Sequence, residues 1–384
     1  MHPRLALSFG NFFAGAHFFL VLYTVAPYLA TLIPDELVGL VIAAGALTTL
    51  AVFPFVPRLV RALGAKKLAL ATAVLSSCLI LALAFSPDPL LAVLIVALFH
   101  ALAPIGAYFL DLLLEATTDN ESATGRVRTL FITFGSLALI ASPLVTGYLL
   151  GPTDLYNRVF LLSAASLAPF FLILLFARIP EGHPPVFAHM KDVAHCLLKD
   201  DDFRAVGIAY GALQFFYHLA PFFIPLYLHN VLGIPWSELG WVFAVMLLPF
   251  LLIEYPAGVL ADHLWGDKEM MAIGFLILGA SLAAVGFVSP FTPLGTIVIV
   301  LVLTRVGAAL CEAMCETHFF RRVSERDANT VGVFRMLRPL GALAAPIAGS
   351  AILFFSSYGV LFFVTGLLTI VVGVAASLSI RDVR

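Results

Sequence analysis

Charge is scarce in this chain of 384 residues: only 11% of the residues are charged and 61% are hydrophobic. The mean hydropathy of +1.04 lies far above the range of soluble domains. The chain has no basic patch, which excludes nucleic-acid binding. It also has no Walker loop, serine-hydrolase elbow, zinc-protease motif or dinucleotide fingerprint. We therefore expect neither an enzyme nor an ATP-driven pump, and no cofactor.

Cysteine is rare as well, and its positions do not predict a disulfide framework. The run from Cys311 to His318 contains cysteine, carboxylate and histidine side chains, all of which bind transition metals. On a helix, however, His318 points away from the stripe formed by Glu312 and Glu316, so the ligands would not converge. We expect no metal site here. The four cysteines are Cys78, Cys196, Cys311 and Cys315.

Long apolar segments fill most of the sequence. A bilayer core of roughly 30 Å needs about 20 apolar residues per helix, and the chain divides into about twelve such segments. We therefore predict an all-α membrane protein with two six-helix halves, residues 1–177 and 204–384. A polar linker, residues 178–203, separates them, and we expect a short interfacial helix from Val186 to Leu198 within it.

Basic residues gather on one side of this predicted topology. Loops on that side carry Arg58, Arg61, Arg321 and Arg322, whereas Arg158 stands alone in the opposite loops. The positive-inside rule then predicts that both termini and the linker are cytoplasmic, in an inner-membrane protein.

The two halves echo one another at an offset of about 200 residues, a spacing typical of a duplicated bundle. Ile33-Pro34 is matched by Ile234-Pro235, and Phe53-Pro54 by Tyr255-Pro256. Two repeats of six helices in the same orientation predict a pseudo-twofold axis along the membrane normal, with a cavity between the halves.

A charged stripe recurs at the same place in both halves. Glu312 and Glu316 share a helical face with Arg305, and Asp111 and Glu115 form a similar pair in the fourth span. Both pairs fall near the cytoplasmic edge of the bilayer, where they could pair with arginines of the next helix as a gate, or simply anchor the helices at the headgroups. The predicted gate comprises Asp111, Glu115, Arg128, Glu312, Glu316, Arg335 and Arg338.

Arg305 falls near the bilayer midplane, whereas Pro104 takes the corresponding place in the first half. Arg305 could attract an anionic substrate or pair with an acid such as Glu254. Glu254 is a candidate proton carrier, with a permanent ion pair as the alternative.

Four uncharged polar residues complete the predicted cavity. Gln214 and His218 share one face with Tyr210, whereas His17 stands alone, which favours a helix–helix hydrogen bond for that side chain. The cavity candidates are His17, His100, Gln214, His218 and Arg305.

The twelve spans, the two six-helix halves and the middle linker resemble the major facilitator superfamily of secondary transporters. The family's cytoplasmic signature is similar to Gly258, Asp262, Gly266 and Lys268, with one extra residue before Gly266 and His263 in place of a usual arginine. The resemblance implies that Asp262 helps to hold the cytoplasmic side shut. The segment from Ser142 to Gly147 is a degenerate version of the family's fifth-helix Gly-Pro motif, which is associated with exporters.

These observations predict a monomeric secondary transporter that moves a small molecule by alternating access. We expect proton-coupled efflux of an amphipathic or anionic compound, with small molecule, protons and lipid bilayer as partners. Proton-linked uptake of a sugar or other metabolite is the alternative. A receptor, flippase or scaffold with a transporter-like fold is an alternative of another class, although a scaffold has no need of a charged gate in both halves.

Overall fold

The computed structural model describes residues 3–85, 88–117, 121–180, 200–263, 266–322 and 328–380. The interfacial helix predicted from Val186 to Leu198 lies outside these residues. Within the described ranges the regular structure is helical, and twelve helical segments are long and apolar enough to cross a membrane. This confirms the predicted all-α membrane class. A bilayer favours such helices because each one satisfies its own backbone hydrogen bonds.

The chain forms two compact units. One contains Met1–Pro185 and Ile224–Ala244, and the other contains Val186–Phe223 and Val245–Arg384. The sequence placed residues 224–244 in the second bundle. They are grouped with the first unit because their aromatic side chains pack there: Tyr23 stacks on Phe243, with ring centroids 5.2 Å apart.

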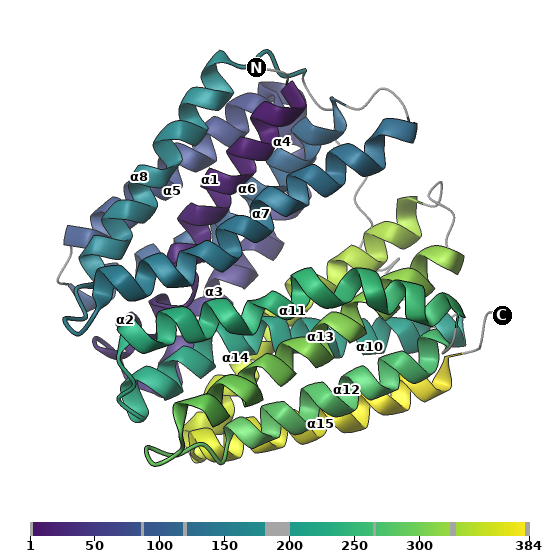
Figure 1. Cartoon of the computed structure of the whole chain (residues 1–384). Coiled ribbons are helices and arrows are strands. Elements are labelled where there is room, and N and C mark those ends of the chain that lie inside the picture. The colour runs from purple at the N-terminus through teal and green to yellow at the C-terminus, as the bar shows by residue number, and fades with distance from the viewer. Residues whose placement is uncertain are drawn as a thin grey trace. The chain divides into compact units, whose positions relative to one another are not determined.

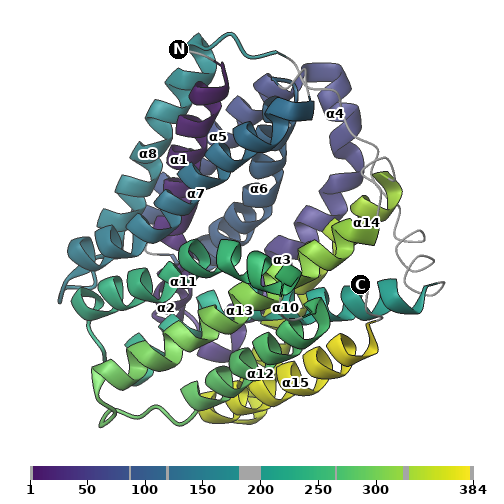
Figure 2. The same ribbon diagram turned by 45° about the vertical axis from the view of Figure 1, so that its right-hand side comes forward.

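The first unit is a bundle in which α1 lies between α7 and α8 (Figures 1 and 2). Helix α5 packs on α6 and α8, and α3 packs on α6. Its core includes the buried side chains of Leu7, Phe109 and Phe170. The helices are α1 (Pro3–Leu22), α2 (Val25–Ala30), α3 (Asp35–Val52), α4 (Val56–Leu63), α5 (Ala65–Phe85), α6 (Pro89–Glu115), α7 (Glu121–Leu150) and α8 (Tyr156–Phe176).

Two spans of this unit are interrupted. The first breaks between α1 and α2, and the second contains the 3₁₀ turn η1 (Phe53–Phe55), where Pro54 cannot donate a backbone hydrogen bond. Gly64, with φ of 84°, then ends α4 in a conformation that favours glycine. The sequence predicted two continuous helices here, because hydropathy reports length and apolarity but not such breaks.

Basic side chains cap helix ends in the first unit. The Nζ of Lys66 donates to the carbonyl oxygen of Ala177 at 3.0 Å, and the Nε of Arg4 donates to that of Thr117 at 3.0 Å. These carbonyls follow α8 and α6, where the last turn of a helix leaves its acceptors without intrahelical partners. Lys66 thus has a local structural role at the end of α8.

The second unit also consists of long helices. Helix α12 runs beside α13 and α15, and the green α12 and yellow α15 are adjacent in both views (Figures 1 and 2). Glycines allow this approach, since a Cβ atom on Gly279 would lie 2.5 Å from the carbonyl oxygen of Gly366. The helices of the second half of the chain are α10 (Asp201–Leu226), α11 (Trp236–His263), α12 (Asp267–Val285), α13 (Leu294–Arg322), α14 (Ala328–Phe355) and α15 (Tyr358–Ser379).

Helix α10 begins at Asp201, three residues before the predicted start of the seventh span at residue 204. Asp201 and Asp202 occupy its first turn, where carboxylates interact favourably with the positive end of the helix dipole. After α10 the chain continues through the π-helical turn η2 (Tyr227–Val231).

Candidate functional site

A tyrosine and a glutamate join α10 to α13 in the second unit. The hydroxyl of Tyr217 donates a hydrogen bond of 2.6 Å to Oε2 of Glu312, and both side chains are partly buried. A hydrogen bond to a charged acceptor is short and strong. The predicted gate residue Glu312 is therefore held by a neutral donor from another helix.

A second tyrosine of α10 holds an arginine of α14. The Nε of Arg338 donates to the hydroxyl of Tyr210 at 2.6 Å, while its terminal nitrogen lies 3.5 Å from Oε1 of Glu316. The side chains of Arg338 and Glu316 are 54% and 43% exposed, so this ion pair contributes little to stability. The structure thus brings together Glu316 and Arg338, two residues of the predicted gate.

Tyr210 and Tyr217 are seven residues apart and share one face of α10 with Gln214. The sequence indicates that Tyr210 lies on this face with Gln214 and His218, but it does not single out Tyr217. The spacing of the two tyrosines was the available signal. Their partners could not be deduced, because the hydrogen bonds join helices that are far apart in the chain.

Arg305 is almost completely buried, with 3% of its surface exposed. Its guanidinium carbon lies 4.7 Å from the centroid of the Phe216 ring, a distance at which a cation and an aromatic face attract one another. The side chain of Glu254, the proton carrier and ion-pair partner suggested by the sequence, lies outside the described residues.

Gln214 and His218 occupy the same side of α10. Nδ1 of His218 lies 2.8 Å from the backbone carbonyl oxygen of Gln214, and the Gln214 side chain is 3% exposed. Helix α14 approaches closely here, since a Cβ atom on Gly341 would lie 2.9 Å from Cβ of Gln214. In the second unit, Gln214 and His218 thus lie on α10 together with the two tyrosines, and Arg305 of α13 packs against Phe216 of the same helix.

In the first unit, His17 connects three helices. Its Nε2 lies 2.7 Å from the hydroxyl of Ser76 on α5, and its Nδ1 lies 2.9 Å from the carbonyl oxygen of Ser163 on α8. The hydroxyl of Ser163 donates back to the carbonyl oxygen of His17 at 2.7 Å. These are the helix–helix hydrogen bonds that the sequence favoured for His17.

His100 is also buried, at 8% exposure, and its Nδ1 lies 3.0 Å from the carbonyl oxygen of Val96 on its own helix. The predicted gate residues of the first unit are more exposed than Glu312. Asp111, Glu115 and Arg128 are exposed, whereas Glu312 is partly buried. The predicted gate residues Asp262 and Arg335 lie in helices, but their side chains are outside the described residues.

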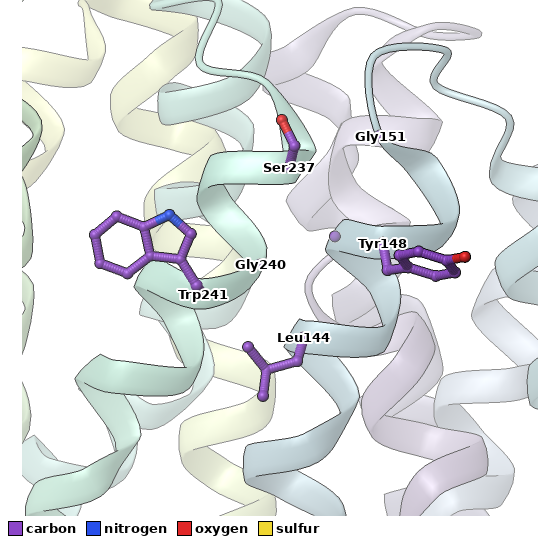
Figure 3. Close-up of a pocket in the computed structure, with 7 residues that line it drawn as sticks. Leu144, Tyr148, Gly151, Ser237, Gly240 and Trp241 are labelled. Atoms are coloured by element: carbon purple, nitrogen blue, oxygen red, sulfur yellow. The ribbon is translucent and has the colours of Figure 1, made fainter.

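A groove of about 320 Å³ runs between α7 and the start of α11. The helices meet through backbone: a Cβ atom on Gly240 would lie 2.7 Å from Cα of Gly147 and from the carbonyl oxygen of Pro143. Tyr148 and Trp241 direct their rings away from each other on opposite sides of this crossing (Figure 3). The seven lining residues carry no charge: Leu144, Gly147, Tyr148, Gly151, Ser237, Gly240 and Trp241.

Comparisons with known proteins agree with this architecture. The sequence matches the profile of the Major Facilitator Superfamily over residues 7–239 and 206–384. Among curated proteins, none matches the sequence.

Solved structures of similar fold are transporters. A variant of the nucleoside transporter NupG has a TM-score of 0.78 and 16% identity, with 99% of this chain and 100% of the other covered. A bacterial homologue of the human lysosomal transporter Spinster, in an inward-facing and occupied conformation, has a TM-score of 0.72 and 14% sequence identity. The match covers 98% of this chain and 95% of the other. A POT family transporter in complex with a thioalcohol-conjugated peptide has a TM-score of 0.77 and 12% sequence identity. The match covers 97% of this chain and 94% of the other.

At such identities the solved structures show the fold alone, and the profile match supplies the family. It extends over both halves of the sequence, and the twelve candidate spans lie within or overlap the matched residues. The chain therefore belongs to the Major Facilitator Superfamily and is an integral membrane transporter.

Proposed function

We propose that this transporter works by secondary active transport and alternating access, exporting a small amphipathic or anionic compound in exchange for protons. It acts as a monomer in the inner membrane, with both termini in the cytoplasm. The observation that carries this proposal is the hydrogen bond between Tyr217 and Glu312, because it holds a carboxylate inside a membrane span. Ionisable groups within membrane spans are costly and are generally functional.

Glu312 is the proton-binding group in this proposal. An ionised carboxylate only accepts hydrogen bonds, so it matches the O–H of Tyr217. Once protonated, the carboxyl group becomes a donor and the charge within the span disappears. The bond to Tyr217 then no longer stabilises a charge, and α10 and α13 are less strongly held together. Protonation at Glu312 can thereby favour one conformation over another.

Arg305 supports an anionic or partly aromatic substrate. Its guanidinium group is packed against Phe216 within a span, so it offers a positive charge beside an apolar face. Gln214 and His218 add polar groups on the neighbouring helix. The nucleosides and peptides named for the structurally similar transporters are suitable first compounds for a screen.

Arg338 is the moving part of the gate. Its contact with Glu316 is long and half-exposed, so the pair is weak and water can replace it when the pair separates. Its shorter bond to Tyr210 gives it a second partner on α10. Arg338 can therefore give up its contact with Glu316 at low energetic cost while it keeps its hydrogen bond to Tyr210.

The experiment begins with a thermal-shift screen of the purified chain against nucleosides, peptides and anionic amphiphiles, because a ligand that binds the folded state raises its melting temperature. The compound with the greatest effect is then loaded into proteoliposomes under a pH gradient. We expect its movement to be accompanied by protons moving in the opposite direction.

Two variants sharpen this test. Arg305→Gln should weaken binding of an anionic ligand about tenfold or more, whereas Arg158→Gln should leave it unchanged, since Arg158 lies in the first turn of α8 in the other unit. Transport of the compound without any proton movement would exclude coupling, and movement of protons in the same direction would exclude exchange.

A further inference from the structure

A buried histidine lies between two buried aspartates at the ends of three helices. Nε2 of His318 on α13 lies 2.9 Å from Oδ2 of Asp202 on α10, and its Nδ1 lies 3.5 Å from Oδ2 of Asp267 on α12. Side-chain exposure is 2% for His318, 2% for Asp202 and 6% for Asp267. None of these residues belongs to the site around Tyr217 and Glu312.

The hydrogen-bonding capacities of this triad call for an additional proton. A neutral imidazole has one N–H donor and one acceptor nitrogen, and ionised carboxylates only accept. Both ring nitrogens of His318 face a carboxylate oxygen. A neutral ring would therefore set its lone pair against one carboxylate, whereas an imidazolium ring directs an N–H towards each of them.

The charge balance favours the same protonation state. With a neutral ring the triad carries two negative charges, which repel one another across the ring. With an imidazolium ring it carries one. Asp202 and Asp267 are in the first turns of α10 and α12, and His318 is near the end of α13, so each charge also suits the dipole of its helix.

Other charged groups around the triad lie nearer the surface in the described part of the chain. On α10, Asp201 is paired with Arg204 at 2.7 Å, and both are well exposed. On α12, Lys268 is partly exposed and Glu269 is exposed. Within α13, Cys315 is buried and Glu316 is half-exposed, while the side chains of Arg321 and Arg322 lie outside the described residues.

We propose that His318, Asp202 and Asp267 form a proton-binding site in which the proton completes an imidazolium ring and holds together the ends of α10, α12 and α13. The site is separate from the carboxyl group of Glu312 and does not depend on the transport proposal. Release of the proton leaves two carboxylates in contact with a neutral ring, which weakens the link among the three helices.

This site is connected to Arg338 through aromatic rings. Phe319 follows His318 and stacks on Phe334 with centroids 4.1 Å apart, and Phe334 stacks on Tyr210 at 4.0 Å. Tyr210 in turn accepts the hydrogen bond from Arg338. Movement of the α13 end on loss of the proton would therefore reach the Tyr210–Arg338 contact.

Nitrogen NMR of the full chain, labelled at histidine, tests the site directly, because protonated and unprotonated ring nitrogens have distinct shifts. The signal of His318 is assigned as the one missing from the His318→Gln spectrum. We expect two protonated ring nitrogens at neutral pH, where an exposed histidine is mostly neutral. In Asp202→Asn the same signal should change to that of a neutral ring. An unprotonated nitrogen in the wild-type signal would overturn the proposal.

A stability measurement covers the case in which His318→Gln does not fold. The melting temperature of the wild type should fall by a few degrees as pH rises through the loss of the bound proton. His318→Arg keeps a permanent cation and should remove this fall. His229→Gln is the control, because His229 faces a single, half-exposed carboxylate, Asp154, at 3.4 Å. The proposal fails if His318→Arg keeps the wild-type pH profile or if His229→Gln alone abolishes it.

Discussion

Tyr210 and Tyr217 show how single hydroxyl groups can organise charge inside a membrane protein. Each lies on α10, and each binds a charged side chain from another helix, Arg338 in one case and Glu312 in the other. A tyrosine can serve both partners because its hydroxyl donates to a carboxylate and accepts from a guanidinium group. One face of α10 thus holds charges of both signs.

Removing the hydroxyl of Tyr217 should therefore destabilise the protein. Tyr217→Phe leaves Glu312 partly buried without its 2.6 Å donor, and we expect a loss of about 1–3 kcal/mol in the free energy of unfolding. Tyr148→Phe is the control, because Tyr148 is 87% exposed. Thermal unfolding of the purified variants measures both. Equal melting temperatures for the two variants would show that the Tyr217 hydroxyl is not important for stability.

Ser163 offers a matching test in the first unit. Ser163→Ala removes the hydroxyl that donates to the carbonyl oxygen of His17 at 2.7 Å, and such bonds between membrane helices contribute about 0.5–2 kcal/mol. Ser379→Ala removes an exposed hydroxyl bonded only to its own helix, and should have no measurable effect. If urea unfolding does not distinguish the two variants, the buried contact adds nothing to the packing of α1 on α8.

At the scale of elements, close helix crossings depend on glycine. Helices α7 and α11 meet at Gly147 and Gly240, and α12 meets α15 at Gly279 and Gly366. In a bilayer the hydrophobic effect does not drive helices together, so close backbone packing contributes a larger share of their association. The sequence motif that ends at Gly147 therefore has a structural function in this chain, whatever its relation to export.

Gly240→Ala should separate α7 from α11. The added methyl group would lie 2.7 Å from Cα of Gly147 and from the carbonyl oxygen of Pro143, and neither backbone atom can move freely. We expect a loss of about 1–3 kcal/mol, as for other overpacked sites. Gly211→Ala is the matched control, since its added methyl group would meet no atom within 4 Å apart from its chain neighbours and the backbone of its own helix. The crossing is loose if both variants melt at the same temperature.

The elements themselves were largely predictable, because the thickness of the bilayer fixes how long an apolar helix must be. Glu316 and Arg338, which the sequence grouped in one predicted gate, lie close together in the structure. Tyr217 with Glu312, and His318 with its two aspartates, were not. These contacts join residues 95, 116 and 51 positions apart, so they depend on how α10, α12 and α13 pack together. Hydropathy contains no information on that packing.

At the scale of the whole molecule, the duplication of the sequence is only partly a duplication of chemistry. The second unit places Arg305, Glu312 and Arg338 around α10, whereas the first has its corresponding acids, Asp111 and Glu115, exposed. We infer that the second unit carries the proton-linked step and that the first contributes mainly the matching scaffold.

The most direct test of this account is proton movement in proteoliposomes for the Glu312→Gln variant, with Glu316→Gln as the control. The ligand found by thermal shift is applied to wild type and both variants, and internal pH is followed with a dye. We predict that Glu312→Gln still binds the ligand but moves no protons with it, while Glu316→Gln moves them at a reduced rate. Wild-type proton movement in the Glu312→Gln variant would contradict the central claim.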